Sequence, residues 1–154
     1  MTALTRFALV LCSIFMALDL IADEQEESTG TTLKAFSTDG CSDFPDGTLA
    51  HKTLWLNCCI EHDLAYWLGG TEQQRIDADE ALKTCVAAVG EPEIAALMLA
   101  GVRVGGSPFW PTTYRWGYGW PYWDGLKPRG YKTLNESEME QAQALKPPMT
   151  ESNH

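Results

Sequence analysis

Apolar positions mark three helices in the middle of the 154-residue chain. The stretch from about Leu54 to Leu68 is rich in apolar and aromatic residues and stops at Gly69-Gly70, which is typical of a helix C-terminal cap. Thr71 to Gln74 then has the form of a capping box that begins a second helix, ending near Val89. The turn between these helices is so short that we expect them to be antiparallel neighbours.

The third predicted helix begins at Pro92, carries the apolar run Ile94 to Val104, and ends at Gly105-Gly106. A helix this apolar either lies in a core or faces a membrane, and a core is the commoner outcome. Residues 107–132 contain many aromatic residues among Gly and Pro, a composition typical of irregular ordered coil. We therefore predict an all-α fold in which a helical hairpin and a third helix precede a long aromatic-rich irregular segment.

The two ends of the chain differ from its middle. Residues 1–22 have one arginine followed by about a dozen apolar residues, which is typical of an export signal or, if it is not cleaved, an N-terminal anchor. Residues 23–37 form a predicted polar linker, residues 38–132 a single small domain, and residues 133–154 a polar tail with one short helix at about 136–145. The protein is thus expected outside the cytoplasm, in the periplasm or beyond the cell.

Charge and cysteine content narrow the function. Eleven basic and 21 acidic residues give a net charge of −10, which repels nucleic-acid phosphates and argues against nucleic acid as a partner. Cys41, Cys58, Cys59 and Cys85 are an even set in an exported domain, so two disulfides are expected, with three possible pairings. Zinc fits poorly, because no C-x-x-C pair is present and adjacent cysteines point in different directions.

The predicted hairpin brings residues of the two helices together. Opposed residues in an antiparallel hairpin have position numbers with a nearly constant sum, and His62 with Asp79, like Cys58 with Cys85, satisfies this rule within one helical turn. Cys59 is rotated by about 100° from its neighbour and is free to reach back to Cys41. We therefore predict the disulfides Cys58–Cys85 and Cys41–Cys59.

This arrangement has a chemical meaning. A histidine held by an aspartate, here His62 by Asp79, is what a general base requires. Asp63 would face the loop that Cys41 anchors, and a carboxylate beside main-chain oxygens suits a hard divalent cation that stabilises an oxyanion. Hydrolysis by activated water follows. A serine hydrolase is disfavoured, because no G-x-S-x-G elbow occurs and Ser107 lacks a visible base.

The hairpin residues resemble the secreted phospholipase A2 superfamily, which has the motif C-C-x-x-H-D-x-x-Y on a helix disulfide-linked to an antiparallel helix. The motif is matched by Cys58, Cys59, His62, Asp63 and Tyr66, and Asp79 stands six residues before Cys85, as in the family. The resemblance covers about residues 38–89. The resemblance implies that His62 activates water, that Asp79 orients the His62 ring, and that Tyr66 donates a hydrogen bond to Asp79. It also implies that Asp63 binds Ca²⁺ and that the substrate is a phospholipid at a membrane interface.

The predicted calcium loop departs from the family pattern. The family has Y-G-C-x-C-G-x-G-G, whereas residues 39–47 here read DGCSDFPDG, and the long insertion between the family's helices is missing, as in short prokaryotic or fungal forms. The main-chain oxygens of Gly40, Ser42 and Phe44 are the expected ligands. Asp43 and Asp46 are alternative ligands, although such residues more often cap turns.

Two functions remain open at this point. One is an exported, calcium-dependent acyl ester hydrolase; the other is a non-catalytic binding or structural protein that keeps the hairpin. The loop separates them, because a Phe44 or Pro45 side chain lying beside Asp63 would exclude the metal. The aromatic segment 110–123 either covers the helices or inserts into a lipid surface, and covering is favoured because few small domains expose so many rings. No protein partner is indicated.

Overall fold

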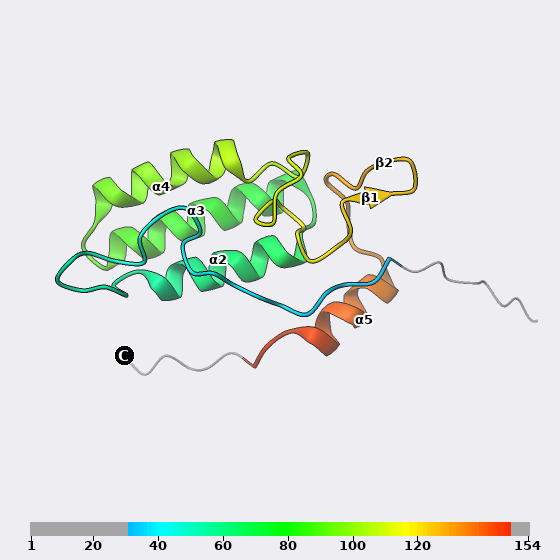
Figure 1. The fold of residues 1–154 in the computed structure, drawn as a ribbon, viewed down its shortest axis with the longest axis horizontal. Coiled ribbons are helices and arrows are strands. Elements are labelled where there is room, and N and C mark those ends of the chain that lie inside the picture. Colours follow the sequence, from blue (N-terminus) through cyan, green and yellow to red (C-terminus); the bar gives the residue numbers. More distant parts are fainter. Residues whose placement is uncertain (1–30, 149–154) are drawn as a thin grey trace, which may run out of the picture. The chain divides into compact units, whose positions relative to one another are not determined.

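The computed structural model describes residues 31–148, and this part of the chain is mostly helical. Its elements are, in order, α2 (Leu56–Leu68), α3 (Glu72–Ala88), α4 (Pro92–Gly105), β1 (Trp123–Asp124), β2 (Lys127–Pro128) and α5 (Glu136–Leu145). Figure 1 shows α2, α3 and α4 side by side, with the segment before α2 crossing over them. The predicted export signal or anchor lies outside the described residues.

The structure contains a helical hairpin formed by α2 and α3, and both expected cysteine pairs are bonded. Gly69 and Gly70 turn the chain with φ angles of 70° and 137°, which L-residues rarely adopt. Thr71 and Gln74 form the complete capping box that starts α3. Sulfur–sulfur bonds join Cys58 to Cys85 and Cys41 to Cys59. The hairpin is therefore closed at its far end by one bridge and attached to the preceding loop by the other.

The third helix has two different faces. Ala95 and Met98 are buried and pack into the core formed by α2 and α3, while Leu97 and Val104 are 58% and 76% exposed. Thus α4 is a half-buried helix, because one side covers the hairpin and the other side is apolar but uncovered. No helix within residues 31–148 is long and apolar enough to cross a membrane.

The folded unit extends beyond the predicted domain limits of 38 and 132. Leu33, from the predicted linker, is 2% exposed and packs in a second core with Trp67, Trp120 and Ala142. Ala142 belongs to α5, the short helix expected in the polar tail. Both terminal segments pack because each brings one or two apolar side chains to the end of α2, a signal too sparse to read from composition.

The aromatic segment mainly covers the hairpin. Trp116 and Trp120 are buried, and their indole N–H groups donate to the main-chain oxygens of Gly70 and Leu68 at 3.0 and 2.7 Å. The Trp120 bond satisfies the carbonyl group of the last residue of α2, and the Trp116 bond holds the turn that follows it. The segment is not wholly irregular as predicted, because β1 and β2 form a small antiparallel hairpin. Two residues per strand are too few to produce a readable alternation.

Candidate active site

His62 of α2 and Asp79 of α3 meet inside the hairpin. His62 Nε2 lies 3.1 Å from Asp79 Oδ1, and the hydroxyl of Tyr66 donates to the same oxygen at 2.7 Å. Asp79 is completely buried and His62 is 8% exposed. The structure thus brings together the three residues that the sequence placed on facing stripes of the hairpin.

The hydrogen bond to Asp79 fixes the tautomer of His62. A carboxylate only accepts hydrogen bonds, so Nε2 carries the proton and Nδ1 is the basic nitrogen. Nδ1 has no hydrogen-bond partner among residues 31–148. A water molecule near this nitrogen would meet an acceptor whose opposite side is already held by a carboxylate.

Tyr66 is a donor in this site. Burial and the neighbouring Asp79 carboxylate raise the pKa of its phenol well above the usual range, so that it keeps its proton. The edge of its ring meets Trp116 at a centroid distance of 5.1 Å. Gly106 lies so close that a Cβ there would overlap the Tyr66 hydroxyl. The aromatic segment and the end of α4 therefore hold Tyr66 in place.

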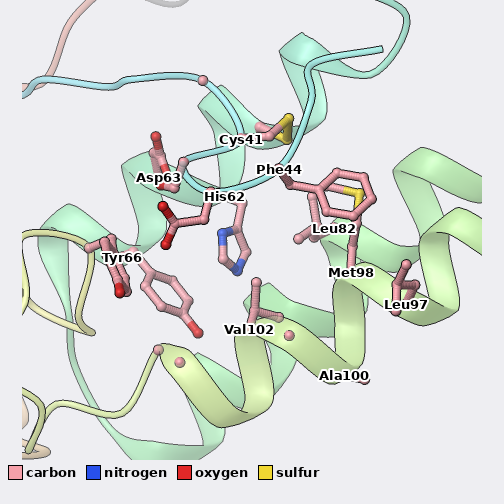
Figure 2. A pocket seen from close by; sticks show the side chains of 18 residues that line it. Cys41, Phe44, His62, Asp63, Tyr66, Leu82, Leu97, Met98, Ala100 and Val102 are labelled. Atoms are coloured by element: carbon pink, nitrogen blue, oxygen red, sulfur yellow. A yellow bond between two sulfur atoms is a disulfide. The ribbon is translucent and has the colours of Figure 1, made fainter. Parts of the chain in front are cut away.

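The loop before α2 is shaped by one of its aspartates. Asp46 Oδ1 accepts the main-chain N–H of Cys41 at 2.9 Å, so Asp46 closes a turn, as the commoner role of such residues suggests. Ser42 has a φ of 53°, in the left-handed region. The Phe44 ring packs toward Trp55, with centroids 6.4 Å apart, and Figure 2 shows it beside Leu82 and Met98. Phe44 thus turns into the core and away from Asp63.

Asp63 is a desolvated carboxylate. Its Oδ2 accepts a hydrogen bond from the Thr38 hydroxyl at 2.6 Å. Burial raises its pKa to about 6, against the lowering effects of Thr38 and His62. Thr38 was not predicted, because nothing in the sequence shows which hydroxyl of a loop will reach a helix.

The residues around Asp63 fit a hard cation in chemistry. The main-chain oxygens of Gly40, Ser42 and Phe44 accept no hydrogen bond within residues 31–148, and their residues line the same cavity as Asp63. Carbonyl oxygens and a carboxylate are the ligands that calcium prefers. In the same part of the chain, no cluster of three or more His, Cys, Asp or Glu side chains could hold a metal. A cation held here would therefore depend on main-chain oxygens as well as on Asp63.

A cavity of about 410 Å³ opens beside His62. Figure 2 shows His62 at its centre, with α4 forming the wall opposite the loop. The apolar part of its lining comes from Phe44, Leu82, Leu97, Met98, Ala100, Val102 and Tyr114. A second, smaller hollow of about 210 Å³ shares Asp63, Ser42 and Tyr114 with it. The site thus combines an imidazole and a carboxylate that line one largely apolar cavity.

Comparison with known proteins gave no match: no family model, no curated protein and no solved structure is similar to this chain. The function is therefore inferred from the residues of the site and their geometry.

Three further residues contact the site without having been predicted there. Arg75 donates to the Tyr66 hydroxyl at 3.2 Å, and Arg103 Nε lies 3.1 Å from Asp79 Oδ2. Trp116 contacts the Tyr66 ring. Arg75 stands four residues before Asp79 on α3, a spacing that could have indicated the contact, whereas the contact of Arg103 with Asp79 depends on how α4 docks on α3.

Proposed function

We propose that the protein is an exported, calcium-dependent hydrolase of the phospholipase A2 type, acting on acyl esters of glycerophospholipids. The observation that carries the proposal is the His62–Asp79 pair, whose Nδ1 has no partner within residues 31–148, beside a largely apolar cavity that Asp63 also lines. A base, a cation ligand and an acyl-sized cavity are the parts that such a hydrolysis needs.

In the proposed reaction, His62 Nδ1 takes a proton from a water molecule, and the resulting hydroxide attacks the ester carbonyl carbon. Asp79 and Tyr66 hold the ring while the imidazolium exists. The imidazolium then gives its proton to the departing alkoxide, so that a fatty acid and an alcohol leave. No covalent enzyme intermediate forms. Asp63 and the main-chain oxygens of Gly40, Ser42 and Phe44 would hold a calcium ion, which would supply positive charge for the developing oxyanion.

The surface around the cavity supports a lipid substrate. The exposed positions of α4 from residue 96 to residue 104 are all apolar, namely Ala96, Leu97, Ala100, Gly101 and Val104. Leu97, Ala100 and Gly101 also line the cavity, so this exposed apolar face continues into the cavity wall. Exposed Trp110 and Tyr114 follow, and such rings favour the lipid–water boundary. With a net charge of −10, we expect zwitterionic head groups to be preferred.

Localisation rests on the two disulfides. Such bonds persist in oxidising compartments, which agrees with export to the periplasm or the exterior.

The test is fatty-acid release from phosphatidylcholine vesicles by the full chain, with calcium and with a calcium chelator. We expect His62→Ala to reduce calcium-dependent release at least a hundredfold. His51→Ala is the matched control, because His51 is exposed and lies outside the cavity lining. Equal release by the parent and His62→Ala would exclude the proposed mechanism. Absence of both release and calcium binding in the parent would favour the non-catalytic alternative.

A further inference from the structure

The second oxygen of the Asp79 carboxylate has an unusual environment. Oδ1 takes the hydrogen bonds of His62 and Tyr66, but buried Oδ2 accepts no hydrogen bond at all within the described residues. Instead, Arg103 Nε lies 3.1 Å from it in an ion pair that lacks hydrogen-bond alignment. A guanidinium therefore holds the side of Asp79 that faces away from the histidine.

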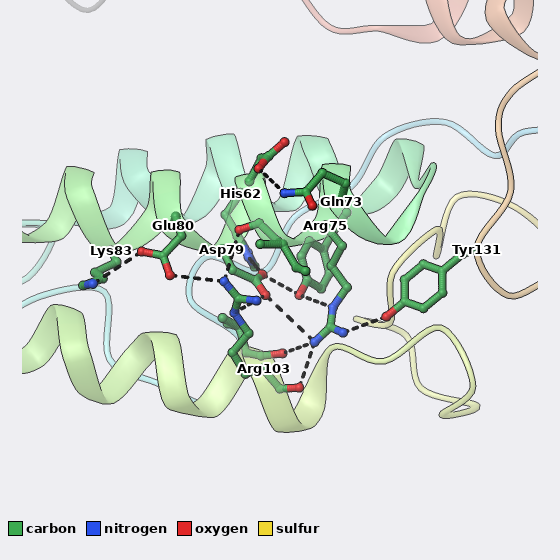
Figure 3. A network of polar contacts seen from close by, with 12 residues as sticks. His62, Gln73, Arg75, Asp79, Glu80, Lys83, Arg103 and Tyr131 are labelled. Atoms are coloured by element: carbon green, nitrogen blue, oxygen red, sulfur yellow. Dashed lines mark hydrogen bonds and ion pairs between the residues drawn. The ribbon is translucent and has the colours of Figure 1, made fainter.

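The two arginines near Asp79 have different tasks. Arg75 Nη2 stands 3.9 Å from Oδ2, and its guanidinium is occupied by the Tyr66 hydroxyl, the Tyr131 hydroxyl and main-chain oxygens of α4. Arg103 donates from Nη2 to the Ile76 oxygen and to Glu80, both at 3.2 Å, while its Nε lies beside Asp79 Oδ2. Figure 3 shows Arg103 reaching from α4 across to α3.

We propose that Arg103 is a positioning residue, which holds Asp79 Oδ2 so that Oδ1 stays on His62 Nε2 and keeps the proton there. This inference rests on the proposed function for its effect on the reaction. The terminal torsion of an aspartate has broad, shallow wells, so hydrogen bonds to one oxygen leave the carboxylate free to rock. A charge on the other oxygen restrains it, and the interaction is strong because Asp79 is excluded from water.

The proposal couples the base to the wall of the cavity. Arg103 belongs to α4, whose residues line the cavity, whereas Asp79 belongs to α3. Correct docking of α4 therefore builds the apolar wall and completes the support of Asp79 in one step. A purely structural Arg103 would join the two helices without influencing the histidine, and the state of His62 distinguishes these roles.

The first measurement is ¹⁵N NMR of the His62 ring in the full-length protein, at about pH 8.5, where an ordinary imidazole is neutral. We expect the parent to show one tautomer, protonated at Nε2, and Arg103→Gln to show a mixture of both. Lys83→Gln is the matched control, because Lys83 also pairs with Glu80 but does not touch Asp79. Unchanged His62 shifts in folded Arg103→Gln would overturn the proposal, whether or not the protein is an enzyme.

Folding of the variant is checked by its thermal unfolding. The Arg103 side chain is 31% exposed, so we expect Arg103→Gln to fold. Should it unfold, Arg103→Lys is the second variant: it keeps the charge but not the fork that serves Asp79 and Glu80 together, and a partial tautomer mixture is expected. A parental tautomer in Arg103→Lys would then reject the need for the guanidinium.

The second measurement is phosphatidylcholine hydrolysis. We expect Arg103→Gln to lower kcat about tenfold or more with little change in KM, since the base is disordered but the cavity remains. Added guanidinium at millimolar concentration should restore part of kcat in Arg103→Gln and none in His62→Ala. A rise in KM alone, or absence of rescue, would assign Arg103 to packing. If the parent itself releases no fatty acid, the proposed function fails while the NMR result still decides the role of Arg103.

Discussion

His62 has two neighbours with contrasting environments. On the α3 side, Asp79 is completely buried and holds His62, Tyr66 and Arg103 around its two oxygens. On the loop side, the Asp63 carboxylate has a single hydrogen-bond donor within residues 31–148, the neutral Thr38 hydroxyl, and burial raises its pKa to about 6. The Asp79 carboxylate is surrounded by cationic and polar partners, whereas the Asp63 carboxylate has lost contact with water and gained few polar contacts.

The difference shows which carboxylate of the site obtains its partners from the folded chain alone. A buried charge is tolerated when it is paired and costly when it is not. The Asp79 carboxylate needs nothing from outside the chain, because His62, Tyr66 and Arg103 supply its partners. On the loop side, by contrast, a bound cation would have the largest favourable effect. We therefore expect changes on the α3 side to destroy the base and changes on the loop side to alter the response to calcium.

The largest effect is expected for Asp79→Asn. Loss of the carboxylate removes the restraint on the His62 tautomer and leaves Arg103 beside a neutral amide. Hydrolysis should fall about 10³–10⁴-fold, as when a catalytic histidine loses its aspartate, and the free energy of unfolding should fall by about 3 kcal/mol. Vesicle assays and urea unfolding measure the two effects. Asp77→Asn, an exposed position on the same helix, is the control. Similar losses in both variants would remove the special role of Asp79.

The second prediction compares the two disulfides. Replacing either pair by alanines should lower the free energy of unfolding by about 3 kcal/mol, because bridges over 27 and 18 residues restrict the unfolded chain to a similar degree. Only Cys41→Ala/Cys59→Ala should also weaken calcium binding, by at least tenfold, because this bridge anchors the loop to α2. Calorimetric calcium titrations measure the affinity. Equal weakening in Cys58→Ala/Cys85→Ala would contradict this division.

The third prediction tests the close approach of α4 to Tyr66. A Cβ on Gly106 would overlap the Tyr66 hydroxyl and lie 2.7 Å from the Val102 oxygen, so Gly106→Ala should lower the free energy of unfolding by about 2 kcal/mol and displace Tyr66 from Asp79. Gly101→Ala is the matched control: its Cβ meets nothing within 4 Å, and the gain in helix propensity should stabilise the protein by up to about 1 kcal/mol. Urea unfolding measures both variants, and an unchanged free energy of unfolding in Gly106→Ala would contradict the close approach of α4 to Tyr66.

The hairpin was predictable from sequence because its signals are local. Gly69-Gly70 and the Thr71 capping box fix the turn, and a tight turn fixes which residues face each other. From that register followed the two disulfides and the meeting of His62 with Asp79. Helical periodicity was thus enough to predict the contact between His62 and Asp79.

The parts of the site and of the fold that were not predictable depend on contacts between segments far apart in the sequence. That Thr38 would reach Asp63 and that Arg103 would reach Asp79 follow from the paths of a loop and of α4, which no spacing rule fixes. The same holds for α5, whose buried Ala142 joins Leu33 from the other end of the folded unit. Such contacts produce no periodic pattern in the sequence, so the hairpin was predictable and the segments packed around it were not.

The smallest effect, and the one that separates the two sides most directly, is expected for Asp63→Asn. The amide still accepts the Thr38 hydroxyl but carries no charge, so without calcium the variant should be about 1–2 kcal/mol more stable than the parent above pH 6. The pKa of Asp63 is about 6 in the folded protein against an ordinary value of 3.8. As the pH falls through 6, folded Asp63 gains its proton before unfolded Asp63 does, so the parent recovers stability and the difference disappears below about pH 4.

Saturating calcium should reverse the order at pH 8, because the ion stabilises only the parent. Urea unfolding at pH 4 and 8, with and without calcium, measures all four values. A parent that is already the more stable protein at pH 8 without calcium would show that the loop side, like the α3 side, is completed by the chain itself.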